Sequence, residues 1–189
     1  AEVGNLELAW LIPLAMVGTV CGWLYFVSEH ASEALSHAIG ERPVVKAMLA
    51  GLALAICGTV LPYTMFAGET QADVLMETYL TIPAGVLIAT GLVKAMLTPA
   101  LINLGWRGGH FFPVIFSGVS LGYGLAILTG ADPVFCVAVC TASTMGAVMR
   151  QPVMVVGLLL MCFPLKGIVC MIIAAVIAAG IPLPKPLRK

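Results

Sequence analysis

Long stretches without a charged residue constrain the fold of this chain more than any other feature. Residues 8–27 and 47–68 contain no Asp, Glu, Lys or Arg. A helix of about twenty apolar residues crosses the roughly 30 Å hydrocarbon core of a bilayer. Hydrophobic residues make up 61% of the sequence and charged residues only 10%, which is too few charges to cover a water-soluble surface. The sequence therefore predicts an all-α integral membrane protein.

The remaining apolar segments are shorter and are interrupted by proline, glycine or single charges. They comprise residues 78–93, 95–106, 108–131, 133–149, 151–165 and 167–184. Several are near or below the roughly 17–25 residues of an ordinary spanning helix. Lys94, Arg150 and Lys166 each separate two of them. We expect tilted and broken transmembrane helices, with residues 1–189 forming a single membrane domain that crosses the cell membrane several times.

Proline and an acidic residue mark several helix boundaries. Asp132-Pro133 is typical of an N-cap followed by proline at the first helical position. Pro152 is placed to begin the next helix in the same way. Pro164 should end or kink that helix, because proline lacks the backbone donor.

Two glycine pairs predict close packing between helices. Gly18 and Gly22 are four residues apart, as are Gly118 and Gly122. Such pairs lie on one face of a helix and let a second backbone approach closely. They indicate packing and carry no functional assignment.

The polar segment 28–43 follows the first apolar stretch. Ala31, Leu35 and Ala38 share one helical face, so we expect the first helix to continue into the interface or water. His30, Glu33 and His37 have a spacing that can bind a metal, but a solvated polar face is the favoured interpretation. No metal and no cofactor is expected.

The charge pattern argues against several classes of protein. Net charge is zero and no basic stripe is present, so nucleic-acid binding has no electrostatic support. No acid–base pair and no Ser/His/Asp arrangement stands out, so an enzyme is not expected. The six cysteines lie in apolar runs without a CxxC pair or zinc-type spacing, which predicts reduced packing residues.

The most informative short stretch is WRGGHFFP, residues 106–113. Gly108-Gly109 predicts a break that permits unusual backbone dihedrals and the close approach of a ligand. Pro113 suits the first turn of a helix, so a helix should begin between His110 and Pro113. The first amides of a helix have no partner within it and lie at the positive end of its dipole. Two interpretations stay open: these amides bind an anion, or a neighbouring loop or water satisfies them.

Residues 108–113, GGHFFP, resemble the GGxFxP motif of the CLC family of chloride channels and proton/chloride antiporters. Lys94 and Thr98 resemble the Lys/Arg-x3-Thr pattern that precedes this motif in the family. Residues 146–160 resemble its GA…RxP segment, which leads into the dimer-interface helices, and PKPLRK at residues 184–189 resembles its GKPLY region. The resemblance covers nearly the whole chain, but only the C-terminal half of a CLC subunit.

This resemblance implies chloride transport by one repeat of an inverted-repeat membrane fold. It implies anions held where helix ends meet, with the amides of His110 and Phe111 as donors and Phe111 beside the pathway. It also implies three partners: the lipid bilayer, an N-terminal CLC-like half and a second subunit in a homodimer. The candidate pathway residues are Gly108, Gly109, His110, Phe111 and Pro113.

Three basic residues are candidates for an electrostatic contribution to the anion path. Lys94 and Arg107 flank the break and would raise the local potential for anions. Each suits equally a water-exposed helix end or a pair with Glu69 or Asp73. Arg188 stands where the family motif has a tyrosine, so the intracellular gate departs from the family pattern.

Two other functions remain open from the sequence. A secondary transporter of another family would use broken helices in a similar way. A membrane assembly module without transport activity would share the same composition. Within the leading hypothesis, the sequence does not distinguish a passive channel from a proton-coupled exchanger.

Overall fold

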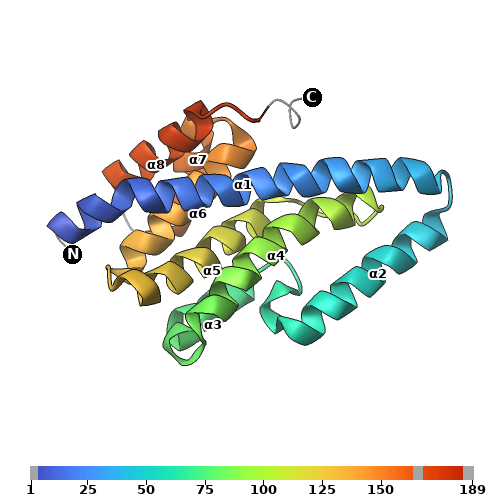
Figure 1. Ribbon diagram of the computed structural model, residues 1–189, viewed down its shortest axis with the longest axis horizontal. Helices are drawn as coiled ribbons and strands as arrows, with labels where there is room; N and C mark the ends of the chain where they lie inside the picture. The colour runs from blue at the N-terminus through green and yellow to red at the C-terminus, as the bar shows by residue number, and fades with distance from the viewer. Residues whose placement is uncertain (1–3, 164–167, 185–189) are drawn as a thin grey trace.

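The computed structural model describes residues 4–163 and 168–184, and this part of the chain is helical without a β-strand (Figure 1). Short turns connect most of the helices. The elements are α1 (Asn5–Ile39), α2 (Pro43–Val60), the 3₁₀ turn η1 (Pro62–Thr64), α3 (Glu69–Thr78), the 3₁₀ turn η2 (Tyr79–Thr81), α4 (Ala84–Asn103), α5 (Phe111–Thr129), α6 (Pro133–Met149), α7 (Pro152–Cys162) and α8 (Ile168–Gly180). The predicted all-α fold is confirmed.

Several of the described helices are long and apolar enough to cross a bilayer, namely α1, α2, α4 and α5. The helices α6, α7 and α8 are apolar but shorter. α1 continues through the polar stretch after residue 28 and ends only at Ile39, which confirms that the first helix extends past its apolar part. The chain is therefore a multi-pass membrane protein.

The predicted helix boundary at Lys94 is wrong. α4 runs without interruption from Ala84 to Asn103, and Lys94 lies in its middle. The residue is only 4% exposed, so it does not mark a water-facing end. A lone charge interrupts an apolar run in the sequence, but it leaves the helix intact where its long side chain reaches polar partners.

α6 forms the centre of the core, and residues 135–147 of this helix are all buried. It packs against α1, where a Cβ on Gly18 would lie 2.8 Å from the carbonyl oxygen of Cys140. It also packs against α5, where a Cβ on Gly118 would lie 2.4 Å from the Cα of Thr141. The backbones therefore approach to distances that only glycine permits, and both predicted glycine pairs lie at helix contacts.

The second members of the two pairs make contacts of the same kind. A Cβ on Gly22 would lie 2.5 Å from the Cβ of Ala147, and a Cβ on Gly122 would lie 2.5 Å from the Cα of Val137. Each pair thus aligns its helix along α6 over a full turn. α6 is held between α1 and α5 as a result.

Two predicted helix boundaries in this core are confirmed. Asp132 caps α6, because its Oδ1 accepts a hydrogen bond of 2.9 Å from the amide of Phe135. α7 begins at Pro152, as expected. The predicted break at Pro164 lies outside the described residues.

Arg150 joins the end of α6 to the end of α8. It occupies the C-cap of α6 in the left-handed conformation, with φ of 58°. Its Nη1 donates to the carbonyl oxygens of Ala179 at 2.9 Å and Ile181 at 2.5 Å. A cation at the C-terminal end of a helix is favourable, because the carbonyls there carry the negative end of the dipole.

The C-terminal end of α4 is fixed to α1 by polar groups. Asn103 Nδ2 donates to the carbonyl of Glu29 at 3.0 Å and to Ser32 Oγ at 2.9 Å. Ser28 Oγ donates to the carbonyl of Met96 at 2.5 Å. These bonds place the point at which the chain leaves α4 and enters the Gly108-Gly109 break.

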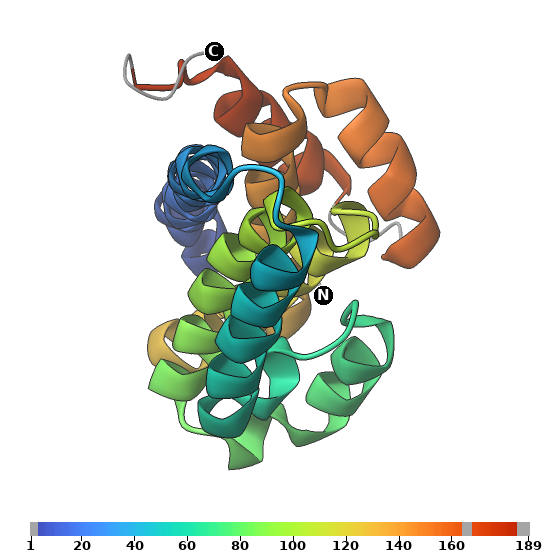
Figure 2. The same ribbon diagram turned by 90° about the vertical axis from the view of Figure 1, so that its right-hand side faces the viewer.

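α2 lies at the edge of the bundle: Figure 1 shows it set apart from α1 and α4, and in Figure 2 it lies in front of the other helices. Ala50 is its buried residue, whereas Val44, Met48 and Val60 are each about 70% exposed. An apolar helix with so little burial presents a surface suited to lipid or to another protein segment.

Gly118→Ala is expected to destabilise the protein, because the new Cβ would force α5 away from α6. Overpacking of this kind costs about 1–3 kcal/mol. The measurement is the thermal midpoint of the purified protein in detergent. Gly157→Ala is the matched control, since a Cβ at this helical glycine of α7 would have nothing within 4 Å. Equal midpoints for the two variants would contradict the packing.

Candidate functional site

α5 begins directly after an irregular segment, residues 104–110. Its first residue is Phe111 and its N-cap is His110, which confirms a helix start between His110 and Pro113. No side chain caps this end. Among the described residues, no acceptor receives the amides of His110, Phe111 or Phe112. The N-terminus of α5 therefore keeps unpaired donors at the positive end of its dipole.

The predicted unusual dihedrals at Gly108-Gly109 are not observed. Gly105 is the left-handed residue of this segment, with φ of 98°, whereas Gly108 and Gly109 do not have positive φ. The amide of Gly105 bonds to the carbonyl of Ile102, and that of Trp106 bonds to Leu101. This is the usual way in which glycine ends a helix, so the special geometry belongs to the end of α4.

Gly108 and Gly109 instead provide an open surface without side chains. Both are exposed, and a Cβ at either position would have nothing within 4 Å. Their backbone is therefore accessible to a ligand or to another protein segment.

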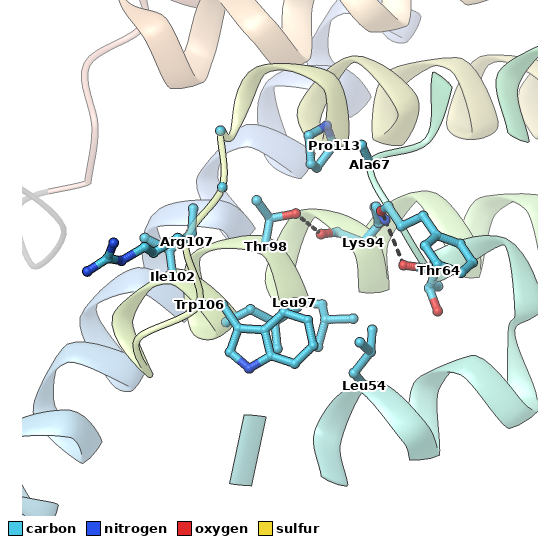
Figure 3. Close-up of a pocket in the computed structure, with 14 residues that line it drawn as sticks. Leu54, Thr64, Ala67, Lys94, Leu97, Thr98, Ile102, Trp106, Arg107 and Pro113 are labelled. Atoms are coloured by element: carbon cyan, nitrogen blue, oxygen red, sulfur yellow. Dashed lines mark hydrogen bonds between the residues drawn. The ribbon is translucent and has the colours of Figure 1, made fainter. Parts of the chain in front are cut away.

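The two glycines line a pocket of about 240 Å³ between α2, α4 and the start of α5 (Figure 3). It brings together predicted site residues from two regions of the sequence: Lys94 from α4, and Arg107, Gly108, Gly109 and Pro113 from the break. The rest of the wall is mostly apolar. The lining residues are Leu54, Thr64, Phe66, Ala67, Lys94, Leu97, Thr98, Leu101, Ile102, Trp106, Arg107, Gly108, Gly109 and Pro113.

Lys94 directs its ammonium group at the turn that follows α2. Nζ donates to the carbonyl oxygen of Thr64 at 2.6 Å, to that of Met65 at 3.4 Å and to that of Phe66. It also lies 5.9 Å from the centre of the Phe116 ring. Of the interpretations left open for Lys94, a water-exposed helix end and a pair with Glu69 or Asp73 are therefore both wrong.

Arg107 has different surroundings. It is exposed at the rim of the pocket, and its guanidinium group extends away from Lys94 (Figure 3). It forms no ion pair with any residue in the described ranges. Its charge is therefore available at the entrance.

The side chains of His110 and Phe111 do not line this pocket. They stack on each other with ring centres 4.8 Å apart, and His110 also lies 6.5 Å from the ring of Tyr25. Both are half-buried. These ring contacts fix the direction of the α5 start, and the residues of the break that line the pocket are Trp106, Arg107, Gly108 and Gly109. Arg188 lies outside the described residues.

Glu69 and Asp73 line a second hollow, of about 350 Å³, between α3 and α5. Phe112, Phe116 and Tyr123 form its wall on the α5 side. This hollow shares no lining residue with the Gly108-Gly109 pocket. The two carboxylates therefore lie beside α5, although they are distant from it in the sequence.

Sequence reasoning missed one wall of the pocket, which Thr64, Phe66 and Ala67 provide. These residues lie inside the apolar stretch 47–68, which was interpreted as one segment. The available signals were Pro62 and Gly68, because both are turn residues. Gly68 has φ of 107°, and a Cβ there would lie 2.5 Å from the Cβ of Phe116.

The described helices form a closely packed multi-pass membrane protein, with an irregular break at the start of α5 that opens into a pocket. The model of one family, described as voltage gated chloride channel, matches residues 1–182. The chain therefore belongs to the voltage-gated chloride channel family, whose description indicates chloride transport across a membrane. Neither the curated proteins nor the solved structures include a match to the chain.

Gly105, which has a positive φ, and Gly109, which has free space around it, should differ in their sensitivity to substitution. Gly105→Ala should lower the free energy of unfolding by about 1–2 kcal/mol, because a Cβ disfavours the left-handed conformation. Gly109→Ala should stay within about 0.5 kcal/mol of the unsubstituted protein. Thermal unfolding of both variants in detergent measures the difference. A larger loss at Gly109 than at Gly105 would contradict this assignment.

Proposed function

We propose that this chain is the second half of a CLC-type chloride transporter of the cell membrane, and that backbone amides at the start of α5 bind the transported anion. One observation carries this proposal: the amides of His110, Phe111 and Phe112 have no described acceptor. They follow directly on the exposed backbone of Gly108 and Gly109. Unpaired amides at a helix N-terminus favour anions because of both hydrogen bonding and the dipole.

The two nearby cations support binding by the backbone. The Lys94 ammonium group is engaged by three carbonyl oxygens, which leaves it little capacity to bind an anion directly. Arg107 is exposed at the rim, where it would raise the local anion concentration. The charge of Arg107 would therefore attract the anion, and the backbone amides of His110, Phe111 and Phe112 would bind it.

The open shape of the site supports a second half as partner. Gly108 and Gly109 are exposed, and Phe112 is 49% exposed. An anion here would be surrounded from one side only, whereas inverted-repeat transporters surround it with helix ends from both repeats. We propose that an N-terminal CLC-like half covers this side. The homodimer contact would involve α7, where Val153 and Met161 are each 87% exposed, and α8, where Val169 is 62% exposed.

Gly109→Val in the full-length protein is expected to reduce chloride flux at least about tenfold while the protein still folds. A β-branched side chain would occupy the space through which the anion reaches the amides, and no described atom lies there now. The assay is chloride efflux from liposomes, with thermal unfolding as the test of folding.

Gly85→Val is the matched control for this substitution. Gly85 is also an exposed glycine near the start of a helix, with nothing within 4 Å of a Cβ, but it lies outside the pocket. Normal flux in a well-folded Gly109→Val protein would count against the anion site.

The 189-residue chain alone is expected to bind halide weakly and not to catalyse proton-coupled exchange. One repeat supplies about half of the donors that an inverted-repeat site requires. Glu69 and Asp73 lie beside α5, but they line the hollow that is separate from the Gly108-Gly109 pocket. The test is to reconstitute the purified chain in liposomes and to record chloride and proton movement together. Stoichiometric, chloride-driven proton uptake would overturn the requirement for two repeats.

Halide binding also separates this proposal from a non-transporting assembly module. Isothermal titration of the full-length protein with chloride should give a saturable signal that Gly109→Val weakens. A transport-inactive module would give none.

A further inference from the structure

The turn at residues 61–68, called here the 61–68 turn, has a backbone that its own sequence does not favour. Phe66 adopts the left-handed conformation, with φ of 59°, although it carries a bulky side chain that is 78% exposed. Such a conformation is unfavourable for a bulky residue and persists only where the surroundings enforce it. The exposed ring of Phe66 does not supply that restraint.

Lys94 supplies the restraint from a different helix. Its Nζ donates to the carbonyl oxygens of three consecutive residues, Thr64, Met65 and Phe66. Three consecutive carbonyls converge on one point only if the backbone curls around it, and the left-handed Phe66 produces that curl. The lysine itself is 4% exposed and is therefore fixed in place.

The 61–68 turn and the break face each other across the pocket. Thr64, Phe66 and Ala67 form one wall, and Gly108 and Gly109 form part of another. The Lys94 side chain lies between these two walls. Figure 3 draws its hydrogen bond to the carbonyl oxygen of Thr64. A shift of the 61–68 turn would change the width of the pocket beside the backbone that the anion approaches.

The carbonyl oxygens also have an electrostatic effect. Without a donor, three carbonyl dipoles at this wall would present their negative ends toward the pocket and repel an anion. An ammonium group bonded to all three cancels that repulsion and stays in place because the bonds are charge-assisted.

We infer that Lys94 is a positioning residue of the anion pathway: it holds the 61–68 turn as a fixed wall and masks the carbonyls of Thr64, Met65 and Phe66 from the anion. This inference rests on the proposed anion site at the start of α5. It assigns to Lys94 a structural contact with the backbone in place of direct anion binding.

The test combines hydrogen–deuterium exchange of peptides covering residues 61–68 with chloride flux, both on the full-length protein. Lys94→Met should speed exchange of these amides about tenfold or more, because charge-assisted bonds to the turn are lost, and should lower flux. Lys94→Arg can donate to at least two of the carbonyls, so it should restore both the slow exchange of residues 61–68 and the chloride flux. Thr90→Val is the control: Thr90 is buried one turn earlier on α4 and bonds only to Val86 of its own helix.

Two results would overturn the inference. One is unchanged exchange of residues 61–68 in Lys94→Met. The other is a Lys94→Arg protein with restored flux but fast exchange, which would show that charge alone matters. If Lys94→Met does not fold, Lys94→Gln tests the same contact, because its shorter, uncharged side chain cannot reach all three carbonyls: exchange of residues 61–68 should again be faster and flux lower, and unchanged exchange would overturn the inference. A wild-type protein without flux would instead refute the proposed function, while the exchange comparison would still test the contact.

Discussion

Backbone polar groups at membrane depth must find partners within the protein, and most of this structure depends on that constraint. The Thr144 hydroxyl donates to the carbonyl of Gly18 across the contact between α6 and α1. Arg150 donates hydrogen bonds to backbone carbonyls near the end of α8, and Lys94 donates to those of the 61–68 turn. In the apolar surroundings of this bundle, cations are thus used to satisfy carbonyls. At the start of α5 no side chain caps the first amides, as is also the case at the starts of α2, α4 and α7. The α5 start differs in that the exposed backbone of Gly108 and Gly109 directly precedes it.

Local sequence signals predicted the parts of the fold that are decided locally. The capping of α6 by Asp132 involves only residues at the start of that helix. The hydrogen bond from the amide of Phe135 to Asp132 can therefore be predicted from four consecutive residues. The glycine pairs predicted that α1 and α5 pack closely, although they could not say that both pack on α6. The partner of a glycine face is chosen by the whole bundle, and a single sequence does not contain that choice.

The errors arose where a side chain acts over a long distance in the sequence. Lys94 was interpreted as a boundary because it is the lone charge in an apolar run, but its partners lie 28–30 residues earlier. Gly108 and Gly109 line the pocket, but the dihedral argument made for them applies to Gly105. A glycine that permits positive φ and a glycine that leaves a surface bare have the same letter in the sequence. Only the backbone geometry separates them.

The strength of binding also explains why the carbonyls around Lys94 matter. A free unit charge 4 Å from a chloride contributes about 4 kcal/mol at an effective dielectric constant of 20, or roughly a thousandfold in affinity. A helix terminus, with about half an elementary charge, contributes roughly half of that energy. An ion held by the larger energy leaves slowly, and conduction requires that it leave. Because the Lys94 ammonium group is surrounded by opposing carbonyl dipoles, its field at the pocket is reduced. At the proposed anion site, the weaker field of the α5 terminus would then decide where the anion rests.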